Sequence, residues 1–258
     1  MTGAIAPADR TIREFIYSLI EGPNIETAVD VGCGRGFDLG QLATRLPGAR
    51  ELIGIDVIEE SADKAADNLS HDQRIKIVSA DIAQGIPLPD HCADLVYSNN
   101  VLECIVDKAS LIREIHRVLR PDGQVICAHY DWDTIVVDGS DKALIRKIVH
   151  AFGDCKQNWM ADCDSWMGRR LWRTFQQTRL FKGAIHAKTL AETDFAPGTY
   201  GYETVQSFEL LVRRGLLSQQ EFDEFISNIV HLQSEMVYIF SVTMYAYSGS
   251  PIGNRLPD

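Results

Sequence analysis

The sequence is short of positive charge, of long apolar runs and of paired cysteines. Its 258 residues carry 25 Lys and Arg against 36 Asp and Glu, a formal net charge of −11. An acidic field repels phosphate backbones, so no nucleic-acid partner is expected. A membrane helix requires roughly 18 consecutive apolar residues. The longest candidate, Met236 to Tyr247, is interrupted by Ser241 and Thr243, so no membrane contact is expected either.

The six cysteines are scattered without a Cys-x-x-Cys pair, and the N-terminal stretch shows no secretory signal. These features predict reduced thiols and a cytoplasmic location. No cluster of His, Cys, Asp or Glu has a spacing typical of metal ligands, so no metal site is predicted. The oligomeric state is not predicted.

The first half of the chain alternates strand-like and helical apolar patterns. Strands are predicted at residues 27–31, 51–57, 75–78, 93–98 and 124–129, and helices at 12–20, 37–46, 61–69 and 111–119. Pro121-Asp122-Gly123 is expected to form a turn before the fifth strand. This cadence indicates βαβ units and a parallel, doubly wound sheet.

The second half predicts mostly helices, at residues 142–152, 164–181, 202–214 and 219–235, with two more strands at 184–193 and 236–247. The predicted fold is an α/β, Rossmann-like sheet of seven strands, mostly parallel with the last strand antiparallel, carrying helical lid insertions. Extra core packing is the alternative to a lid. The predicted division is a cofactor-binding core at 1–137, a helical lid at 138–183, and the last two strands at 184–258 with a second insertion at about 199–235.

The most informative stretch runs from Val29 to Gly36, where Asp30 precedes Gly32, Gly34 and Gly36. It ends the first strand and opens a helix, where glycines allow a tight turn and a close approach to a ligand. The spacing Gly-x-Gly-x-Gly differs from that of dinucleotide sites. Asp56 ends the second strand, and a carboxylate there can accept both hydroxyls of a ribose. A dinucleotide would place its pyrophosphate near the carboxylate of Asp30, which disfavours NAD.

Two more features follow later strands. Ser79 to Ile82 ends the third, where Asp81 can accept from an adenine amino group and Ile82 can pack on the ring. Ala93 to Glu103 ends the fourth and precedes the segment from Leu111 to Gly123. As an ordered set over about residues 25–130, these motifs closely resemble class I S-adenosylmethionine-dependent methyltransferases. The closest likeness is to the small-molecule group called type 11 or menaquinone/ubiquinone-biosynthesis-like.

The resemblance implies S-adenosyl-L-methionine as cofactor and assigns residues to its parts. Asp30 would lie near the methionine amino group, and Asn99 beside the methionine portion at the floor of the transfer site. The remaining cofactor residues would be Gly32, Gly34, Gly36, Asp56, Val57, Asp81 and Ile82. The family often has histidine where this chain has Cys104, which we interpret as a packing residue.

Acceptor groups are predicted after the fifth strand and in the tryptophan- and arginine-rich segment from Trp159 to Arg173. His129 is the candidate general base, and Trp132 a candidate pocket wall. Arg169 and Arg170 are candidates for clamping an acceptor carboxylate or phosphate. The alternative for each is structural: local packing for His129 and Trp132, and an amphipathic helix with a solvated arginine face.

The predicted function is transfer of a methyl group, by in-line displacement, to an O or N atom of a small-molecule metabolite. Two alternatives stay open. One is a nucleic-acid methyltransferase, although Tyr97-Ser98-Asn99-Asn100 stands where amino-methylating enzymes carry an Asn-Pro-Pro-Tyr type motif. The other is a protein that binds the cofactor on this fold without methylating.

Overall fold

The computed structural model describes residues 8–22 and 24–252, and these form a seven-stranded sheet in the order β3-β2-β1-β4-β5-β7-β6. Every neighbouring pair is parallel except those made by β7, which is antiparallel to both β5 and β6. The predicted fold class is therefore confirmed. The strands are β1 (Thr27–Val31), β2 (Glu51–Asp56), β3 (Ile75–Ser79), β4 (Ala93–Asn99), β5 (Leu119–Val137), β6 (Phe181–Glu192) and β7 (Phe240–Pro251).

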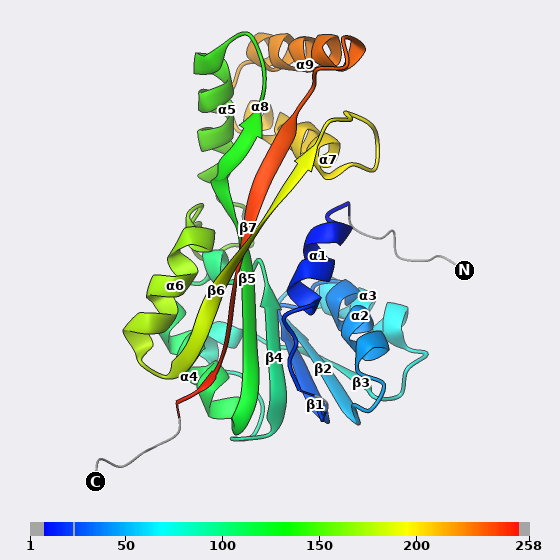
Figure 1. Ribbon diagram of the computed structural model, residues 1–258, viewed down its shortest axis with the longest axis vertical. Helices are drawn as coiled ribbons and strands as arrows, with labels where there is room; N and C mark the ends of the chain where they lie inside the picture. The colour runs from blue at the N-terminus through cyan, green and yellow to red at the C-terminus, as the bar shows by residue number, and fades with distance from the viewer. Residues whose placement is uncertain (1–7, 23, 253–258) are drawn as a thin grey trace.

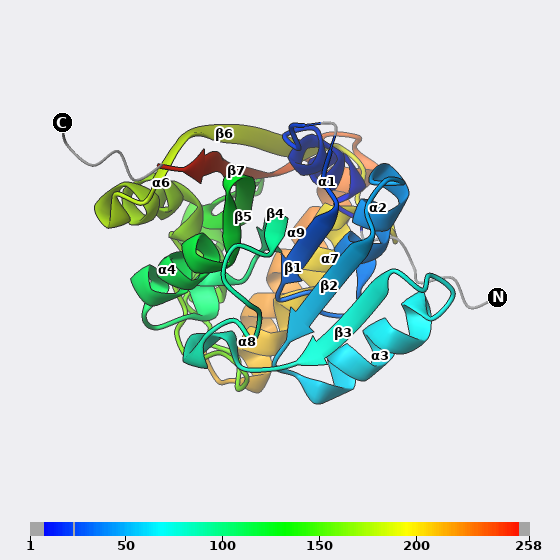
Figure 2. The same ribbon diagram turned by 90° about the horizontal axis from the view of Figure 1, so that it is seen from below.

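Helices cover both faces of this sheet (Figures 1 and 2). Alternate residues of β1 point to opposite faces, so Ala28 packs with α1 and α2 while Val29 packs in the core beneath α4 and α6. The described helices are α1 (Arg10–Tyr17), α2 (Phe37–Arg45), α3 (Glu59–Leu69), α4 (Lys108–Val118), α5 (Lys142–Gly153), α6 (Met167–Thr178), α7 (Tyr200–Ser207), α8 (Glu209–Arg213) and α9 (Gln219–Ser234), with short 3-10 turns at Ile82–Gln84 and Leu102–Cys104. None of these helices combines the length and apolarity that crossing a membrane requires.

The strand β5 is much longer than predicted. The turn expected at Pro121 to Gly123 lies within β5 and forms an irregularity in its pairing with β4. The register shifts there, because Ala93 pairs with Leu119 but Leu95 pairs with Gln124. At its other end β5 continues beside β7 as far as the pair Val137 and Phe240. Hydrogen bonds to the long antiparallel strand β7 satisfy the backbone N–H and C=O groups of this extension. Sequence periodicity alone does not reveal such a pairing.

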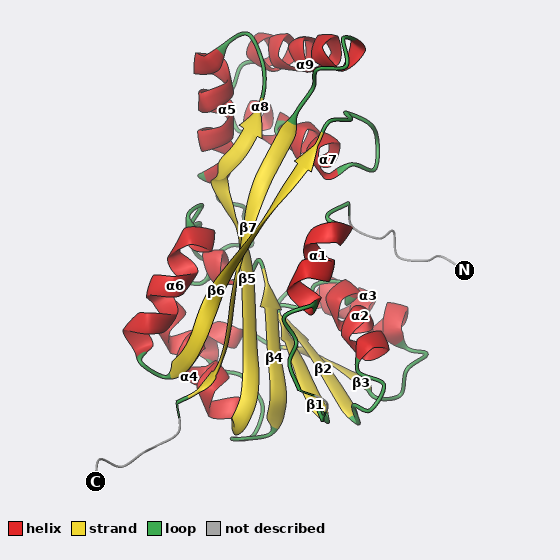
Figure 3. Cartoon of the chain, viewed as in Figure 1, coloured by secondary structure: helices red, strands yellow, loops and turns green. Residues whose placement is uncertain are grey.

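The extended ends of β5, β6 and β7 carry α5, α7, α8 and α9, as Figure 3 shows at the top of the view. Ser218 and Glu221 form a capping box at the start of α9, where the helix predicted at 219–235 begins. The single helix predicted at 202–214 is divided at Phe208 into α7 and α8. The predicted division into core, lid and second insertion stays a proposal. Within the segment proposed as the lid, α6 lies on the sheet beside α4, whereas α5 belongs to the upper helical group.

Candidate cofactor site

The glycine loop between β1 and α2 forms the edge of the site. Gly32, Gly34 and Gly36 have φ values of +77°, +53° and +83°, a region that side chains disfavour. A Cβ on Gly32 would collide with the side chain of Val101, so the loop and the segment after β4 are in close contact. A Cβ on Gly34 would meet no atom within 4 Å. The backbone at Gly34 is thus exposed to open space, as a ligand-cradling loop requires.

That open space is a cavity of about 590 Å³ at the carboxyl ends of the parallel strands. This is the size and position expected of a small-molecule site on such a sheet. Seven of the predicted cofactor residues line it, namely Gly32, Gly34, Asp56, Val57, Asp81, Ile82 and Asn99. Gly36 and Asp30 are not among the lining residues: Gly36 is the N-cap residue of α2, and Asp30 is buried in β1.

Asp56 is held in place by the loop it faces. One carboxylate oxygen accepts from the backbone N–H of Gly34 at 2.8 Å, and the other from that of Ile58 at 2.9 Å. Each oxygen keeps a second lone pair, so the carboxylate can still accept from two vicinal hydroxyls. Val57 follows directly and is 56% exposed, which presents an apolar side chain to the same cavity.

Asp81 and Ile82 stand beside Asp56 at the end of β3. The Oδ1 atom of Asp81 caps the following 3-10 turn by accepting from the N–H of Ala83 at 3.0 Å. Its other oxygen is available to a donor in the cavity, and the buried Ile82 supplies an apolar contact next to it. This pairing suits an adenine ring with an exocyclic amino group.

The floor of the site contains polar atoms without partners. Oδ2 of Asp30 and Oδ1 of Asn99 are both buried, and neither has a hydrogen-bond partner among the described residues. Such groups are costly unless satisfied. Burial, followed by the nearby charge of Asp38, raises the pKa of the Asp30 carboxyl well above its ordinary value, while Arg13 opposes the rise. An ammonium group bound here would satisfy both oxygens, so the chain's own residues fit the methionine end of the cofactor.

The burial of Asp30 predicts a pH dependence. Because its pKa is raised in the folded protein, the folded state binds more protons than the unfolded state as pH rises from about 4. The contribution of this carboxyl to the free energy of unfolding therefore falls as pH rises. A bound ammonium group should stabilise the carboxylate, which offsets this loss and releases the proton from Asp30. We expect Asp30→Asn to flatten the fall in the free energy of unfolding, measured by urea titration at several pH values. Equal slopes in both proteins would contradict this account.

Three residues at this floor were not predicted from the sequence. Asp38, in the first turn of α2, accepts from the hydroxyl of Tyr17 and pairs with Arg13, both on α1. Its Oδ2 also lies 3.4 Å from Nδ2 of Asn99. Acidic residues in the first turn of a helix are common because they favour its dipole, so Asp38 carried no special signal. The four-residue spacing of Arg13 and Tyr17 on one face of α1 was the available hint.

The predicted general base does not line the cavity. His129 on β5 is fully buried, and its Nδ1 lies 2.8 Å from the carbonyl oxygen of Tyr130. Its Nε2 lies 3.7 Å from Oε2 of Glu103, an oxygen that also accepts from the indole N–H of Trp132 at 2.8 Å. Neither His129 nor Trp132 is among the lining residues. Their catalytic and substrate roles stay predictions.

Cys104 does line the cavity, at the end of the turn that follows β4. Burial raises the pKa of its thiol to about 12, with Glu103 adding to the rise. A thiol in this state is a weak nucleophile. The structure thus supports our interpretation of Cys104 as a packing residue.

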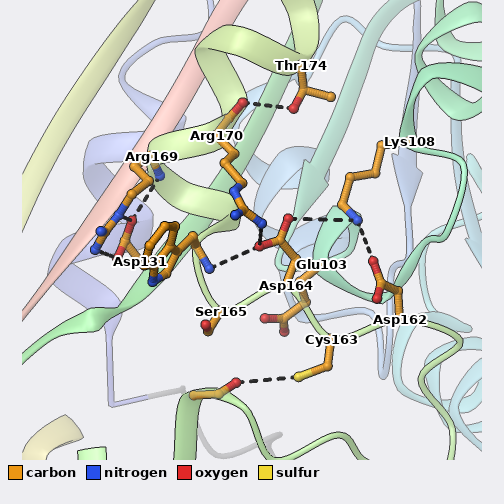
Figure 4. A network of polar contacts seen from close by, with 12 residues as sticks. Glu103, Lys108, Asp131, Asp162, Cys163, Asp164, Ser165, Arg169, Arg170 and Thr174 are labelled. Atoms are coloured by element: carbon orange, nitrogen blue, oxygen red, sulfur yellow. Dashed lines mark hydrogen bonds and ion pairs between the residues drawn. The ribbon is translucent and has the colours of Figure 1, made fainter. Parts of the chain in front are cut away.

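The two predicted arginine clamps are engaged elsewhere (Figure 4). Arg169 pairs with the fully buried carboxylate of Asp131, and Arg170 pairs with Asp164. Both guanidinium groups also lie over the ring of Trp166, at 4.7 and 5.1 Å from its centre. Neither arginine lines the cavity, so their role in acceptor binding stays a prediction.

No group of three or more His, Cys, Asp or Glu in residues 8–22 and 24–252 is arranged to hold a metal ion. Apolar and aromatic residues outside the cofactor motifs line the rest of the cavity wall. Ile105 and Val106 follow β4, and Trp159 and Ala161 come from the segment that joins α5 to α6. A backbone hydrogen bond of 3.0 Å from Asp162 to Cys104 ties that segment to the turn after β4.

Comparison with known proteins agrees with this geometry. Residues 29–127 match the family described as methyltransferase domain. Trans-aconitate 2-methyltransferase of Paracidovorax citrulli is 38% identical over 95 residues, which cover 37% of this chain and 35% of that protein. Demethylmenaquinone methyltransferase of Staphylococcus aureus is 30% identical over 122 residues, covering 47% and 50%. The chain spans about half or less of the length of the curated relatives it matches.

The fold likeness extends further along the chain. The crystal structure of the YcgJ protein from Bacillus subtilis superposes with a TM-score of 0.60 at 15% identity, covering 94% of this chain and 98% of that one. At that identity the likeness shows a shared fold only. The family, enzyme class and cofactor predicted from the sequence are confirmed at the level of the matched domain. Over residues 29–127 the chain is thus similar to the methyltransferase domain family, and the curated relatives it matches include named methyltransferases.

Proposed function

We propose that this chain binds S-adenosyl-L-methionine in the cavity at the carboxyl ends of β1, β2 and β4 and transfers its methyl group to an O or N atom of a small-molecule metabolite. The observation that carries the proposal is the set of polar atoms in and beneath that cavity: the free lone pairs of Asp56 and Asp81 and the unpartnered oxygens of Asp30 and Asn99. These atoms follow the strand order β3, β2, β1 and β4. Adenine, ribose and the amino acid follow one another in the same order along S-adenosylmethionine.

Bound S-adenosylmethionine supplies a methyl group already activated by the sulfonium. The chain's own residues therefore have to bind, orient and exclude water. Asp56 would hold the ribose, Asp81 and Ile82 the adenine, and Asp30 with Asn99 the ammonium. Arg13 and Tyr17 keep Asp38 beside Asn99, which fixes the floor from the side of α1.

A small-molecule acceptor is favoured over a nucleic acid by the net charge of −11. The relatives named for trans-aconitate and demethylmenaquinone support the same class, though their matches cover only part of each protein. The helical group on the ends of β5, β6 and β7 stands on the side of the sheet where a lid would exclude water. Location in the cytoplasm also stays a proposal.

The test is transfer of radiolabel from methyl-labelled S-adenosylmethionine. Calorimetry should first show one cofactor site per chain. We then expect label in a product when the protein is given a panel of carboxylic acids, quinols, phenols and amines. Asp56→Ala should abolish the labelling at a cofactor concentration that saturates the wild type. Label in RNA or DNA instead would support the first alternative, and tight binding without transfer to any acceptor would support the second.

A further inference from the structure

The sheet has two edges, and they are protected unequally. At one edge lies β3, which has only five residues and therefore offers little length for pairing. At the other edge lies β6, which has 12 residues, no proline and no bulge in its pairing with β7. Figure 2 shows β6 along the outer side of the molecule, at the top of the view. A long and regular edge strand pairs readily with a further strand, so β6 is the edge that can accept a partner.

The register between β6 and β7 determines which backbone groups of β6 face outward. The N–H of Ile252 donates to the carbonyl oxygen of Leu180 at 2.8 Å, so hydrogen-bonded pairs recur at every second residue and include the even-numbered residues of β6. The N–H of Thr243 agrees with this frame, because it donates toward β5 and so points away from its β6 partner. The backbone of the odd-numbered residues therefore faces outward. Along the accessible part of the strand these are Gly183, Ile185, Ala187, Thr189 and Ala191.

These five outward residues leave their backbone unpaired. None of their N–H and C=O groups has a hydrogen-bond partner among residues 8–22 and 24–252. Four of the five are exposed, and Gly183 is half-buried. Apolar side chains flank the same stretch: Ile185 is 38% exposed and Trp172 of α6 is 43% exposed. The ring of Trp172 lies 6.3 Å from that of Tyr247, which is the β7 partner of Ile185. A strand laid along β6 would therefore gain backbone hydrogen bonds and apolar contact together.

We propose that β6 pairs antiparallel with β6 of a second copy of this chain, about a two-fold axis at Ala187, so that the two sheets become continuous. Such an axis pairs Ala187 with the partner's Ala187 and Ile185 with the partner's Thr189. It likewise pairs Gly183 with the partner's Ala191. All five outward residues of each copy then find outward residues of the other, which gives about ten backbone hydrogen bonds. Two identical strands that pair antiparallel form a self-complementary, closed interface, the commonest kind in homodimers.

The charges of β6 favour a second copy as the partner and Ala187 as the axis. Lys182 lies five residues before Ala187 and Glu192 five residues after it. The axis therefore sets Lys182 of each copy opposite the partner's Glu192, and opposite charges across a strand pair are stabilising. Glu192 accepts from two backbone N–H groups at the start of α7, which fixes its position. An axis moved to Lys188 would set this residue opposite the partner's Lys188, which like-charge repulsion disfavours.

The first test is sedimentation velocity of the full chain over a concentration series. We expect the wild type to dimerise. Ala187→Pro removes the outward N–H at the axis but no hydrogen bond to β7, and it should raise the dimer dissociation constant at least about tenfold. Ala187→Ser is the matched control, because it keeps this N–H and a small side chain, and its dissociation constant should stay within about twofold of the wild type.

Two further pairs of variants test the charges and the register. Lys182→Glu sets like charges opposite each other at both ends of the interface and should raise the dissociation constant about tenfold, whereas Lys76→Glu on β3 changes the net charge equally and should not. Ala187→Cys should form a disulfide-linked dimer with oxidised glutathione, because the two Cα atoms would lie about 5.5 Å apart across the axis. The Cα atoms of two copies of Ala184→Cys would lie about 20 Å apart, so this variant should cross-link no more than the wild type.

Each of three results would overturn the proposal. A wild type that stays monomeric at about 100 μM would leave β6 to a different partner protein. A dimer that Ala187→Pro and Lys182→Glu do not weaken would place the interface on another surface. Equal cross-linking of Ala187→Cys and Ala184→Cys would exclude the axis at Ala187. Calorimetry with S-adenosylmethionine and urea unfolding verify that each variant is folded. None of these measurements depends on methyl transfer, so their failure is distinguishable from failure of the proposed activity.

Discussion

Replacing Asp56 with alanine should weaken binding of S-adenosylmethionine by about 100-fold or more. Hydrogen bonds to a charged acceptor contribute about 1.5–3 kcal/mol each, and two ribose hydroxyls would lose theirs. The same substitution removes the acceptor of the Gly34 and Ile58 N–H groups, so the glycine loop also loses its anchor to β2. Calorimetric titration of cofactor into wild type and variant measures the difference.

The matched control is Glu60→Ala, which removes one negative charge from an exposed position on α3 near the same strand end. Its exposed pair with Lys64 contributes little, so cofactor affinity should stay within about twofold. Cooperative urea unfolding of Asp56→Ala would show that the loss is local. Wild-type affinity in that variant would mean that the ribose lies elsewhere in the cavity.

The half of the fold that positions the cofactor could be predicted because its information is local. The strand β1 has the predicted bounds, and Asp56, Asp81 and Asn99 each follow or end a strand whose apolar run is short and unambiguous. Carboxyl ends of parallel strands meet at one edge, so side chains at those ends come together whatever the details of the loops. The glycines between β1 and α2 added a backbone requirement that few other residues meet.

The remaining features depend on pairs that sequence spacing does not reveal. Asp38 meets Arg13 across 25 residues, and Trp159 reaches the cavity from a segment that follows α5. The length of β5 is determined by its neighbour β7, more than 100 residues later. The composition of the tryptophan- and arginine-rich segment predicts acceptor binding, but composition does not show which carboxylate of the folded chain each arginine pairs with.

Arg169→Ala should lower the free energy of unfolding by about 3 kcal/mol, because it leaves the carboxylate of Asp131 buried without its counter-charge. That carboxylate is fully buried, and two nitrogens of the guanidinium contact it. A Cβ on Gly168 would lie 2.8 Å from Asp131, so α6 approaches β5 closely at this point and the pair helps hold the helix on the sheet. Urea unfolding measures the loss, and cofactor affinity should stay within a few-fold because Arg169 does not line the cavity.

Two variants separate this structural role from acceptor binding. Arg173→Ala removes an exposed arginine of the same helix and should change stability by no more than about 0.5 kcal/mol. Asp131→Asn/Arg169→Ala removes both charges and should recover part of the lost stability, since the cost arises from the unpaired carboxylate rather than from the missing arginine. An Arg169→Ala protein with the stability of the wild type but a raised acceptor KM would instead support the acceptor clamp predicted from the sequence, and would place the acceptor against α6.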